Sequence, residues 1–205
     1  MHQVYPIFTT PIYKCNIPLS PEIVSKVHSA SFNRTKLDNG YISTDRRILD
    51  NTLFSYEREI VNEHVDIFTR DYLRVDKCIQ FNIENSWIVK HEEGDIAHPH
   101  RHINSALSGI LYVQVDERSG DLYFHNDINS NIPFNAMIRL PIVEHNIYNS
   151  RLWHFTPQNG DLFIFPSALM HSVSQSTSSN SRYCISFNVY PRGQLEKESI
   201  SALYL

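Results

Sequence analysis

The spacing of apolar residues changes along the chain from a helical period to a strand period. Between residues 52 and 73, apolar side chains recur at helical spacing, and most charged side chains fall on the other sides of the helix. The members of the apolar stripe are Leu53, Ile60, Val61, Phe68 and Tyr72. This pattern predicts a helix that packs on the outside of a sheet. His64 lies near the stripe, and we interpret it as a structural or surface residue.

The first 50 residues carry a different set of signals. Prolines at positions 6, 11 and 18 argue against a helix in residues 1–19, whose apolar side chains favour extended structure. A short helix is expected to start at Ser20-Pro21-Glu22, which offer a capping hydroxyl, a proline at the first helical position and an acid in the first turn. It is expected to bury Ile23, Val24 and Val27 and to end before the turn signal Asn39-Gly40.

From residue 77 onward, short runs of alternating or apolar residues are separated by turn signals, which is the pattern of β-strands. Alternation at 79–83 is followed by Trp87, Ile88 and Val89. Further strands are expected at 107–115, 121–125, 136–143, 151–155, 161–165 and 182–190. Turn signals lie at 93–95, 119–120, 131–133 and 159–160. This series after a helical N-terminal third predicts a sandwich or jelly roll flanked by helices.

Composition places the chain among globular proteins. Its 205 residues favour one domain, and 41% apolar with 20% charged residues is typical of a soluble protein. The net charge of -4 gives no reason to expect nucleic acid or a membrane as a partner. The three cysteines, Cys15, Cys78 and Cys184, are far apart and predict no disulfide framework. With no signal peptide or membrane-spanning stretch visible, we expect a cytoplasmic protein.

A histidine cluster is the first candidate for chemistry. His98, His100 and His102 occupy every second position of HPHRH, and alternate residues of a strand point to one face. His100 and His102 could therefore hold one metal ion, although an exposed polar strand edge is the simpler reading. In GDLFIFPSALMH, a turn, a buried strand and a proline precede His171. That order could return His171 to the first pair as a third ligand.

A polar stripe on the last predicted strand is the second candidate. In RYCISFNVY, alternation places Arg182, Cys184, Ser186 and Asn188 on one face and apolar side chains on the other. A buried arginine is costly unless it is paired, and a carboxylate is its natural bidentate partner. The partner could be an aspartate or glutamate of the protein, or the carboxylate of a ligand.

These segments together resemble a known family, the Fe(II)- and 2-oxoglutarate-dependent oxygenases. The similarity is to small oxygenases of bacteria and phages that are related to prolyl 4-hydroxylases. It rests on HRHINSALSGILYV at 100–113, GDLFIFPSALMH at 160–171 and RYCISFN at 182–188, in that order. The opening IFTTPIY at 7–13 is also similar to the N-terminal strand of that group.

The resemblance implies a mainly β, α+β fold: a double-stranded β-helix (a cupin-like jelly roll) with flanking N-terminal helices. Residues 1–205 would form one domain, divided into an N-terminal strand and supporting helices (1–76), the β-helix core (77–192) and a C-terminal tail (193–205). The implied activity is hydroxylation of an unidentified small molecule or protein side chain, coupled to decarboxylation of 2-oxoglutarate to succinate.

The resemblance also implies roles for individual residues. His100 and His171 match the two histidine ligands of iron, Arg182 matches the arginine that binds the distal carboxylate of 2-oxoglutarate, and Ser186 matches the hydroxyl that assists it. Where the family pattern has aspartate, this chain has His102. A three-histidine site could hold Fe(II) or zinc. A carboxylate ligand could instead come from Asp95, Asp121 or Asp127.

A second departure concerns the 2-oxoglutarate pocket. Leu111 stands where relatives often have tyrosine, and alternation is expected to point the adjacent Tyr112 to the other face. His91 could compensate if its strand faces inward. Two alternative functions therefore stay open beside the oxygenase: a metal-binding jelly roll without catalysis, and a zinc enzyme that uses three histidines.

Overall fold

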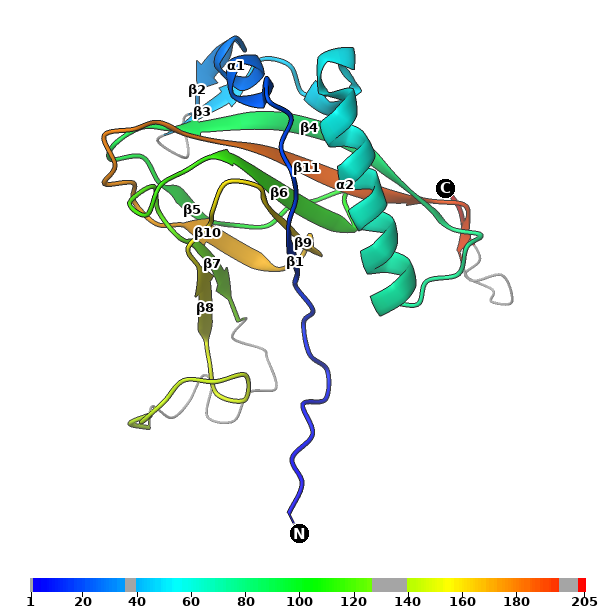
Figure 1. Ribbon diagram of the computed structural model, residues 1–205. Coiled ribbons are helices and arrows are strands. Elements are labelled where there is room, and N and C mark those ends of the chain that lie inside the picture. The colour runs from blue at the N-terminus through cyan, green and yellow to red at the C-terminus, as the bar shows by residue number, and fades with distance from the viewer. Residues whose placement is uncertain (1, 36–39, 127–139, 196–202) are drawn as a thin grey trace.

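Two antiparallel β-sheets form the body of the protein in this computed structural model, which describes residues 2–35, 40–126, 140–195 and 203–205 (Figure 1). The larger sheet has seven strands in the order β1-β9-β6-β11-β4-β3-β2. In this order the strands are β1 (Tyr13–Asn16), β9 (Asp161–Pro166), β6 (Leu107–Gln114), β11 (Arg182–Arg192), β4 (Gln80–His91), β3 (Tyr41–Ser43) and β2 (Phe32–Arg34).

The smaller sheet has four strands in the order β5-β10-β7-β8. They are β5 (Ala97–His100), β10 (Met170–Val173), β7 (Leu122–His125) and β8 (Leu152–Phe155). β5 is an edge strand and contains Pro99, a residue tolerated at sheet edges because it has no N–H to donate. A two-stranded pair, β12 (Gln194–Leu195) with β13 (Leu203–Tyr204), lies outside both sheets.

Apolar side chains fill the space between the two sheets. The larger sheet contributes Tyr112, Phe163 and Phe165 to this layer, and the smaller sheet contributes Leu122 and Phe124. Phe124 and Phe165 meet edge to face, with ring centroids 4.9 Å apart. Packing of this kind between two antiparallel sheets makes the jelly roll that the strand pattern predicts.

The helical elements cover the opposite face of the larger sheet. They are α1 (Ile23–His28), the 3₁₀ turns η1 (Ile48–Asp50) and η2 (Thr52–Phe54), α2 (Ser55–Ile67) and its π-helical extension η3 (Phe68–Tyr72). Val61, Val65 and Phe68 pack in one core with Ile185 and Phe187 of β11. The prediction of a helix on the outside of a sheet is therefore confirmed. β6 is buried over nearly its whole length because helices lie on one side of it and the second sheet lies on the other.

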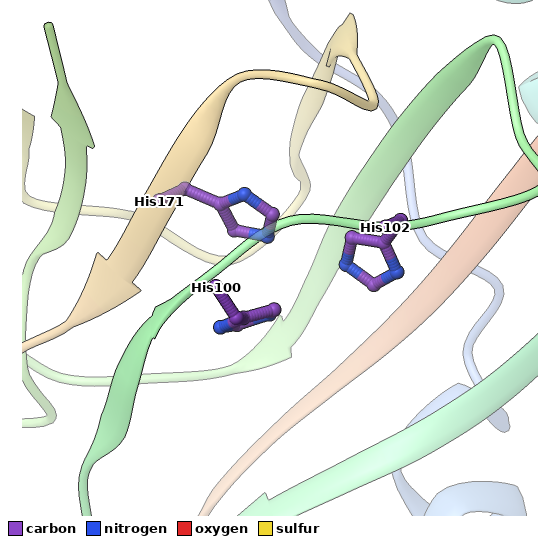
Figure 2. Close-up of side chains that lie close together, drawn as sticks. All are labelled: His100, His102 and His171. Carbon is purple, nitrogen blue, oxygen red and sulfur yellow. The ribbon is translucent and has the colours of Figure 1, made fainter. Parts of the chain in front are cut away.

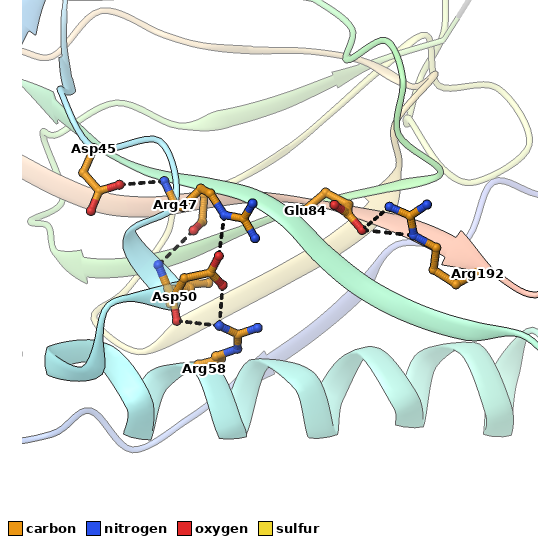
Figure 3. Close-up of polar contacts among 8 residues, drawn as sticks. Asp45, Arg47, Asp50, Arg58, Glu84 and Arg192 are labelled. Atoms are coloured by element: carbon orange, nitrogen blue, oxygen red, sulfur yellow. Dashed lines mark hydrogen bonds and ion pairs between the residues drawn. The ribbon is translucent and has the colours of Figure 1, made fainter. Parts of the chain in front are cut away.

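Surface ion pairs lie within the helical layer and within the larger sheet. Asp50 at the end of η1 forms ion pairs with Arg47 and Arg58, and Arg192 of β11 pairs with Glu84 of β4 at 2.8 Å (Figure 3). Because these side chains are partly exposed, the pairs contribute little to stability.

The strand predictions need several corrections, and β10, β12 and β13 were not predicted. The two segments at 79–89 form one strand, β4, and the register slips between Asn188 and Val189 of its partner. Such an irregularity shifts the alternation, so one strand reads as two. Residues 140–143 contain no strand, and the rest of the expected 136–143 strand lies outside the described residues, as does the turn signal at 131–133. The hairpin of β2 and β3 was not predicted.

The N-terminal predictions need further corrections. Only Tyr13–Asn16 of the extended segment pairs in the sheet, and the residues before it run away from the body with exposed side chains (Figure 1). α1 begins at Ile23 rather than at the proline, because the Ser20 hydroxyl donates to Glu57 instead of capping the helix. Val24 is 37% exposed rather than buried. Leu53 and Tyr72 are exposed as well, while Glu57 is buried.

Among the described residues, no helix combines the length and the apolar character needed to cross a membrane.

Candidate active site

Three imidazoles meet between the two sheets at the open end of the smaller one. His100 ends β5 and His171 lies on β10, and the two residues are direct partners in the antiparallel register. His102 follows β5 in an irregular segment, where its main-chain N–H donates to the Ser167 carbonyl at 3.1 Å. One ring nitrogen from each histidine lies within 4.8 Å of the others, as Figure 2 shows for the three side chains. This spacing allows one metal ion to contact all three.

Backbone carbonyls fix the tautomer of two of these rings, that is, which ring nitrogen carries the proton. His100 Nδ1 lies 2.7 Å from the His98 carbonyl, and His171 Nδ1 lies 2.9 Å from the Leu169 carbonyl. A carbonyl only accepts hydrogen bonds, so Nδ1 carries the proton in each neutral ring and Nε2 keeps its lone pair. Metal-binding histidines in proteins are oriented in this way.

Burial keeps the rings of His102 and His171 neutral. It lowers the pKa of His171 to about 3 and, together with His100, the pKa of His102 to about 4. Phe165 stands edge to face on His171, and Trp87 lies 5.8 Å from His102 between ring centroids. The rings therefore present lone pairs rather than positive charges to an ion.

Arg182 lies in the same pocket with few partners. Its side chain is 2% exposed, and its Nη1 donates a long hydrogen bond of 3.4 Å to the Ser119 carbonyl. Nε has no partner, and among the described residues no carboxylate lies within ion-pair distance of the guanidinium. The ring of Tyr112 lies 5.6 Å from the guanidinium carbon. A buried cation without a counter-charge is costly and is suited to an anionic ligand.

Two further buried polar groups near Arg182 lack partners, His91 in the lining of the pocket and Tyr112 behind it. The Tyr112 hydroxyl is buried without a hydrogen bond, and burial raises its pKa, so the phenol is neutral. His91 is the register partner of Arg182, and its Nδ1 is buried and unpaired. Burial and the charge of Arg182 lower the pKa of His91 to about 3. The pocket thus offers the Arg182 cation and the neutral His91 ring as partners for a carboxylate, and the Tyr112 ring lies next to the guanidinium.

The cavity that Arg182 and His91 line has a volume of about 230 Å³. It contains all six residues singled out in the sequence, and Thr35, Tyr41 and Ile42 from the β2–β3 segment close one side of it. The six are His91, His100, His102, His171, Arg182 and Ser186. The polar stripe of β11 faces the cavity as expected, with Arg182, Cys184 and Ser186 in its lining, while Asn188 bonds to Ser108 and Asn85.

The structure corrects the expectation for β6. Tyr112 faces Arg182, whereas Leu111 packs in the core under the helices. The register pairs Cys184 with Tyr112 and Ser186 with Ile110, so the even-numbered residues of β6 share the face of Arg182. Tyr112 and Ser108 lie an even number of positions apart on β6, so their side chains point to the same face. The polar Ser108 was therefore the signal in the sequence that could have placed Tyr112 on the face of Arg182.

The carboxylates considered as alternative ligands lie elsewhere. Asp95 accepts a hydrogen bond from the Glu92 N–H and pairs with Arg34 at 3.3 Å. Asp121 accepts a hydrogen bond from Thr156. Neither belongs to the histidine group, and Asp127 lies outside the described residues. His64 contacts Tyr13 and Cys15 on the far side of the larger sheet, in agreement with a structural role.

Comparison with known proteins identifies the family. The family described as "Putative 2OG-Fe(II) oxygenase" matches residues 85–188, which is 104 of the 205 residues and includes all six pocket residues named above. The chain belongs to this family. The membership confirms the resemblance and the enzyme class, a 2-oxoglutarate-dependent Fe(II) oxygenase, and disfavours the non-catalytic module and the zinc enzyme. Sequence comparison with curated proteins gives no match.

Solved structures of 2OG-Fe(II) oxygenases share the fold of this chain. HygX from Streptomyces hygroscopicus, with nickel and 2-oxoglutarate bound, is 10% identical, with a TM-score of 0.62 over 96% of this chain and 92% of that one. A prolyl hydroxylase from Trichoplax adhaerens, in complex with a hypoxia-inducible-factor peptide, is 14% identical, with a TM-score of 0.62 over 89% and 84%. A Pseudomonas putida prolyl-4-hydroxylase is 13% identical, with a TM-score of 0.57 over 88% and 93%. At these identities the likeness establishes the jelly-roll fold.

Proposed function

We propose that this oxygenase holds Fe(II) on His100, His102 and His171. The convergence of three imidazole nitrogens within 4.8 Å supports this assignment, and so do the carbonyls that orient two of the rings. The set is neutral, because histidine replaces the carboxylate of the usual two-histidine, one-carboxylate site. An ion bound here keeps its full double charge, which favours an anionic co-ligand.

We further propose that Arg182 binds the distal carboxylate of 2-oxoglutarate, with help from Ser186, His91 and Tyr112. The observation that carries this proposal is the buried guanidinium, which has no acidic partner in the described part of the chain. A carboxylate would supply the missing counter-charge and would accept hydrogen bonds from the unpaired groups around it. The cavity that contains Arg182 also contains the three histidines, so one dicarboxylate could reach both.

When bound, Fe(II) and 2-oxoglutarate together supply the oxygen activation that converts 2-oxoglutarate, O₂ and a C–H bond into succinate, CO₂ and an alcohol. The protein's role is to hold the metal ion and 2-oxoglutarate in the correct relative position and to exclude water from the apolar side of the cavity. Phe165, Ile110 and Val173 form much of that side.

The substrate is proposed as a class, a small molecule or a protein side chain. Both kinds are bound in structures that share this fold, hygromycin B in HygX and a peptide in the Trichoplax adhaerens enzyme. In this chain, Trp87, Tyr41 and Ile42 line the cavity beside the histidines and are placed to contact such a substrate.

The experiment is succinate release and oxygen uptake by protein reconstituted with Fe(II) and 2-oxoglutarate. We expect slow turnover even without a primary substrate. Arg182→Gln is expected to weaken 2-oxoglutarate binding by about 10–100-fold, because charge-assisted hydrogen bonds contribute about 1.5–3 kcal/mol.

Arg192→Gln provides the matched control, since Arg192 lies on the same strand and pairs with Glu84 on the surface. The proposal fails if the iron-loaded wild type releases no succinate and Arg182→Gln binds 2-oxoglutarate as well as the wild type does.

A further inference from the structure

The segment that carries His102 lacks the support of a β-ladder. His100 and His171 lie on paired strands, but residues 101–106 between β5 and β6 have no regular structure. Asn104 within this segment adopts a left-handed backbone with a φ of 54°, which costs free energy in a residue other than glycine. Something other than strand pairing must therefore hold the third imidazole in place.

Ser167 makes three hydrogen bonds to this segment. Its carbonyl accepts from the His102 N–H at 3.1 Å, and its own N–H donates to the Ala106 carbonyl at 3.0 Å. Its hydroxyl donates to Ser105 Oγ at 2.8 Å, and Ser105 in turn donates to the Leu107 carbonyl. Ser167 itself is fully buried, so water cannot replace these contacts.

Ser167 is anchored on its other side to three strands of the larger sheet. Its Oγ lies 2.8 Å from Ser108 Oγ on β6, and Ser108 lies 2.8 Å from Asn188 Oδ1 on β11. The Asn188 amide donates to Asn85 on β4 at 2.9 Å. Ser105, Ser108, Ser167 and Asn188 form a chain, which we call the serine ladder, from the rigid sheet to the His102 segment.

We infer that Ser167 is a positioning residue for His102, and that through the serine ladder it holds this imidazole at the distance a metal ion requires. The inference rests on the proposed function, since it assumes that His102 is a metal ligand. A binding site needs its side chains placed within about 0.5 Å of the productive geometry, and a residue on an irregular segment reaches that precision only through such supports.

The test is a Co(II) titration of the metal-free protein and of three variants, Ser167→Ala, His102→Ala and the double variant. Residues that orient a metal ligand typically contribute about 10–100-fold to metal affinity. We expect a loss of that size in each single variant, with a changed visible absorption of the bound Co(II). The double variant is expected to lose no more than His102→Ala does, because Ser167 acts through His102.

Ser176→Ala is the matched control. Ser176 is also buried, and its hydroxyl has no hydrogen-bond partner, so this variant is expected to bind Co(II) like the wild type. Thermal unfolding of each metal-free variant separates a folding defect from a defect in the metal site.

Two results for Ser167→Ala would overturn the inference, and a third result would overturn the proposed metal site with it. One is an unchanged Co(II) affinity in Ser167→Ala while His102→Ala loses affinity, which leaves the proposed metal site intact. The other is a further loss when Ser167→Ala is added to His102→Ala, which would show that Ser167 acts on the whole pocket. If His102→Ala itself binds Co(II) as the wild type does, the three-histidine set is wrong and the inference falls with it.

Discussion

Tyr112 places a buried hydroxyl beside Arg182 without a hydrogen-bond partner. Tyr112→Phe removes a polar group whose desolvation is not compensated, so the free energy of unfolding of the metal-free protein is expected to stay constant or to rise by up to about 1 kcal/mol. The same change is expected to weaken 2-oxoglutarate binding by about 10-fold, because a hydrogen bond to a charged carboxylate is lost. Urea unfolding and a 2-oxoglutarate titration measure the two effects.

Tyr183→Phe is the control for that prediction, because Tyr183 lies on the opposite face of β11 in the core under the helices. A loss of stability in Tyr112→Phe, or equal 2-oxoglutarate affinities in the two variants, would contradict the role given to the Tyr112 hydroxyl.

Two buried histidines make stability depend on pH. Burial lowers the pKa of both His91 and His171 to about 3, well below the value of about 6.5 expected in the unfolded chain. The unfolded chain therefore takes up protons below pH 6.5 that the folded protein does not bind, and stability is lost as the pH falls. For the metal-free protein we expect a loss of about 1 kcal/mol per histidine between pH 6.5 and 5.5.

Urea unfolding at pH 7.5, 6.5 and 5.5 measures this dependence. His91→Gln is expected to reduce the slope, since one of the rings whose pKa is lowered by burial is gone. Equal stability of the wild type at pH 7.5 and 5.5 would contradict the assignment of neutral, buried rings.

At the residue scale, the sequence shows which residues belong to the site better than it shows which way their side chains point. The histidines, Arg182 and Ser186 were selected by residue type and spacing, and they line one cavity. The prediction for the Tyr112 side chain was wrong because β6 is buried on both faces. The apolar pattern of such a strand does not show which face meets the second sheet.

Among the elements, β6 and β11 pack so closely that one position accepts only glycine. A Cβ added at Gly109 would lie 2.1 Å from the ring of Phe187, which is fully buried. Gly109→Ala is expected to lower the free energy of unfolding by about 1–3 kcal/mol through overpacking. Thermal or urea unfolding measures the change.

A second substitution tests the cause of that loss. Phe187→Leu removes the ring edge that Gly109→Ala would strike, so the double variant is expected to lose less stability than the sum of the two single variants. Additive losses would show that the strain lies in the backbone rather than in this contact.

Elements with a strong local pattern were predictable, and elements held by their neighbours were not. α2, β6, β9 and β11 have apolar periods long enough to be read from the chain. β2 and β3 have only three residues each, and their pairing with β4 depends on contacts far along the sequence. His102 was expected on a strand with His100, but β5 ends at His100. Hydrogen bonds from Ser167 of the serine ladder support the segment of His102 in place of strand pairing.

For the whole molecule, a metal ion would link two parts of the smaller sheet. Only two register pairs join β5 to β10, with an irregularity between them, and His100 and His171 form one of these pairs. We expect metal at 100 times its dissociation constant to raise the free energy of unfolding by about 2.7 kcal/mol. Hydrogen exchange is expected to slow most in residues 97–102 and 170–173.

His171→Ala is the control, and it is expected to abolish both the stabilisation and the local protection. Protection spread evenly over the larger sheet, or confined to other segments, would contradict a metal site at this junction.

The overall architecture could be predicted further than the shape of the site. Strand number and the N-terminal helices indicated a jelly roll, and the order of the three motifs indicated the family. The relation of Arg182 to the histidines depends on how β11 and β10 face each other across two sheets, which no local pattern encodes. For the same reason Asp95 and Asp121 could not be excluded until their positions were known.

Pro99 has a consequence for association between molecules. An unpaired edge strand is a template on which another chain can add a strand, and β5 is such an edge beside the cavity. Pro99 removes a backbone donor between His98 and His100, which makes this edge a poor template. The sheet edge next to the histidines is thereby protected from aggregation through strand addition.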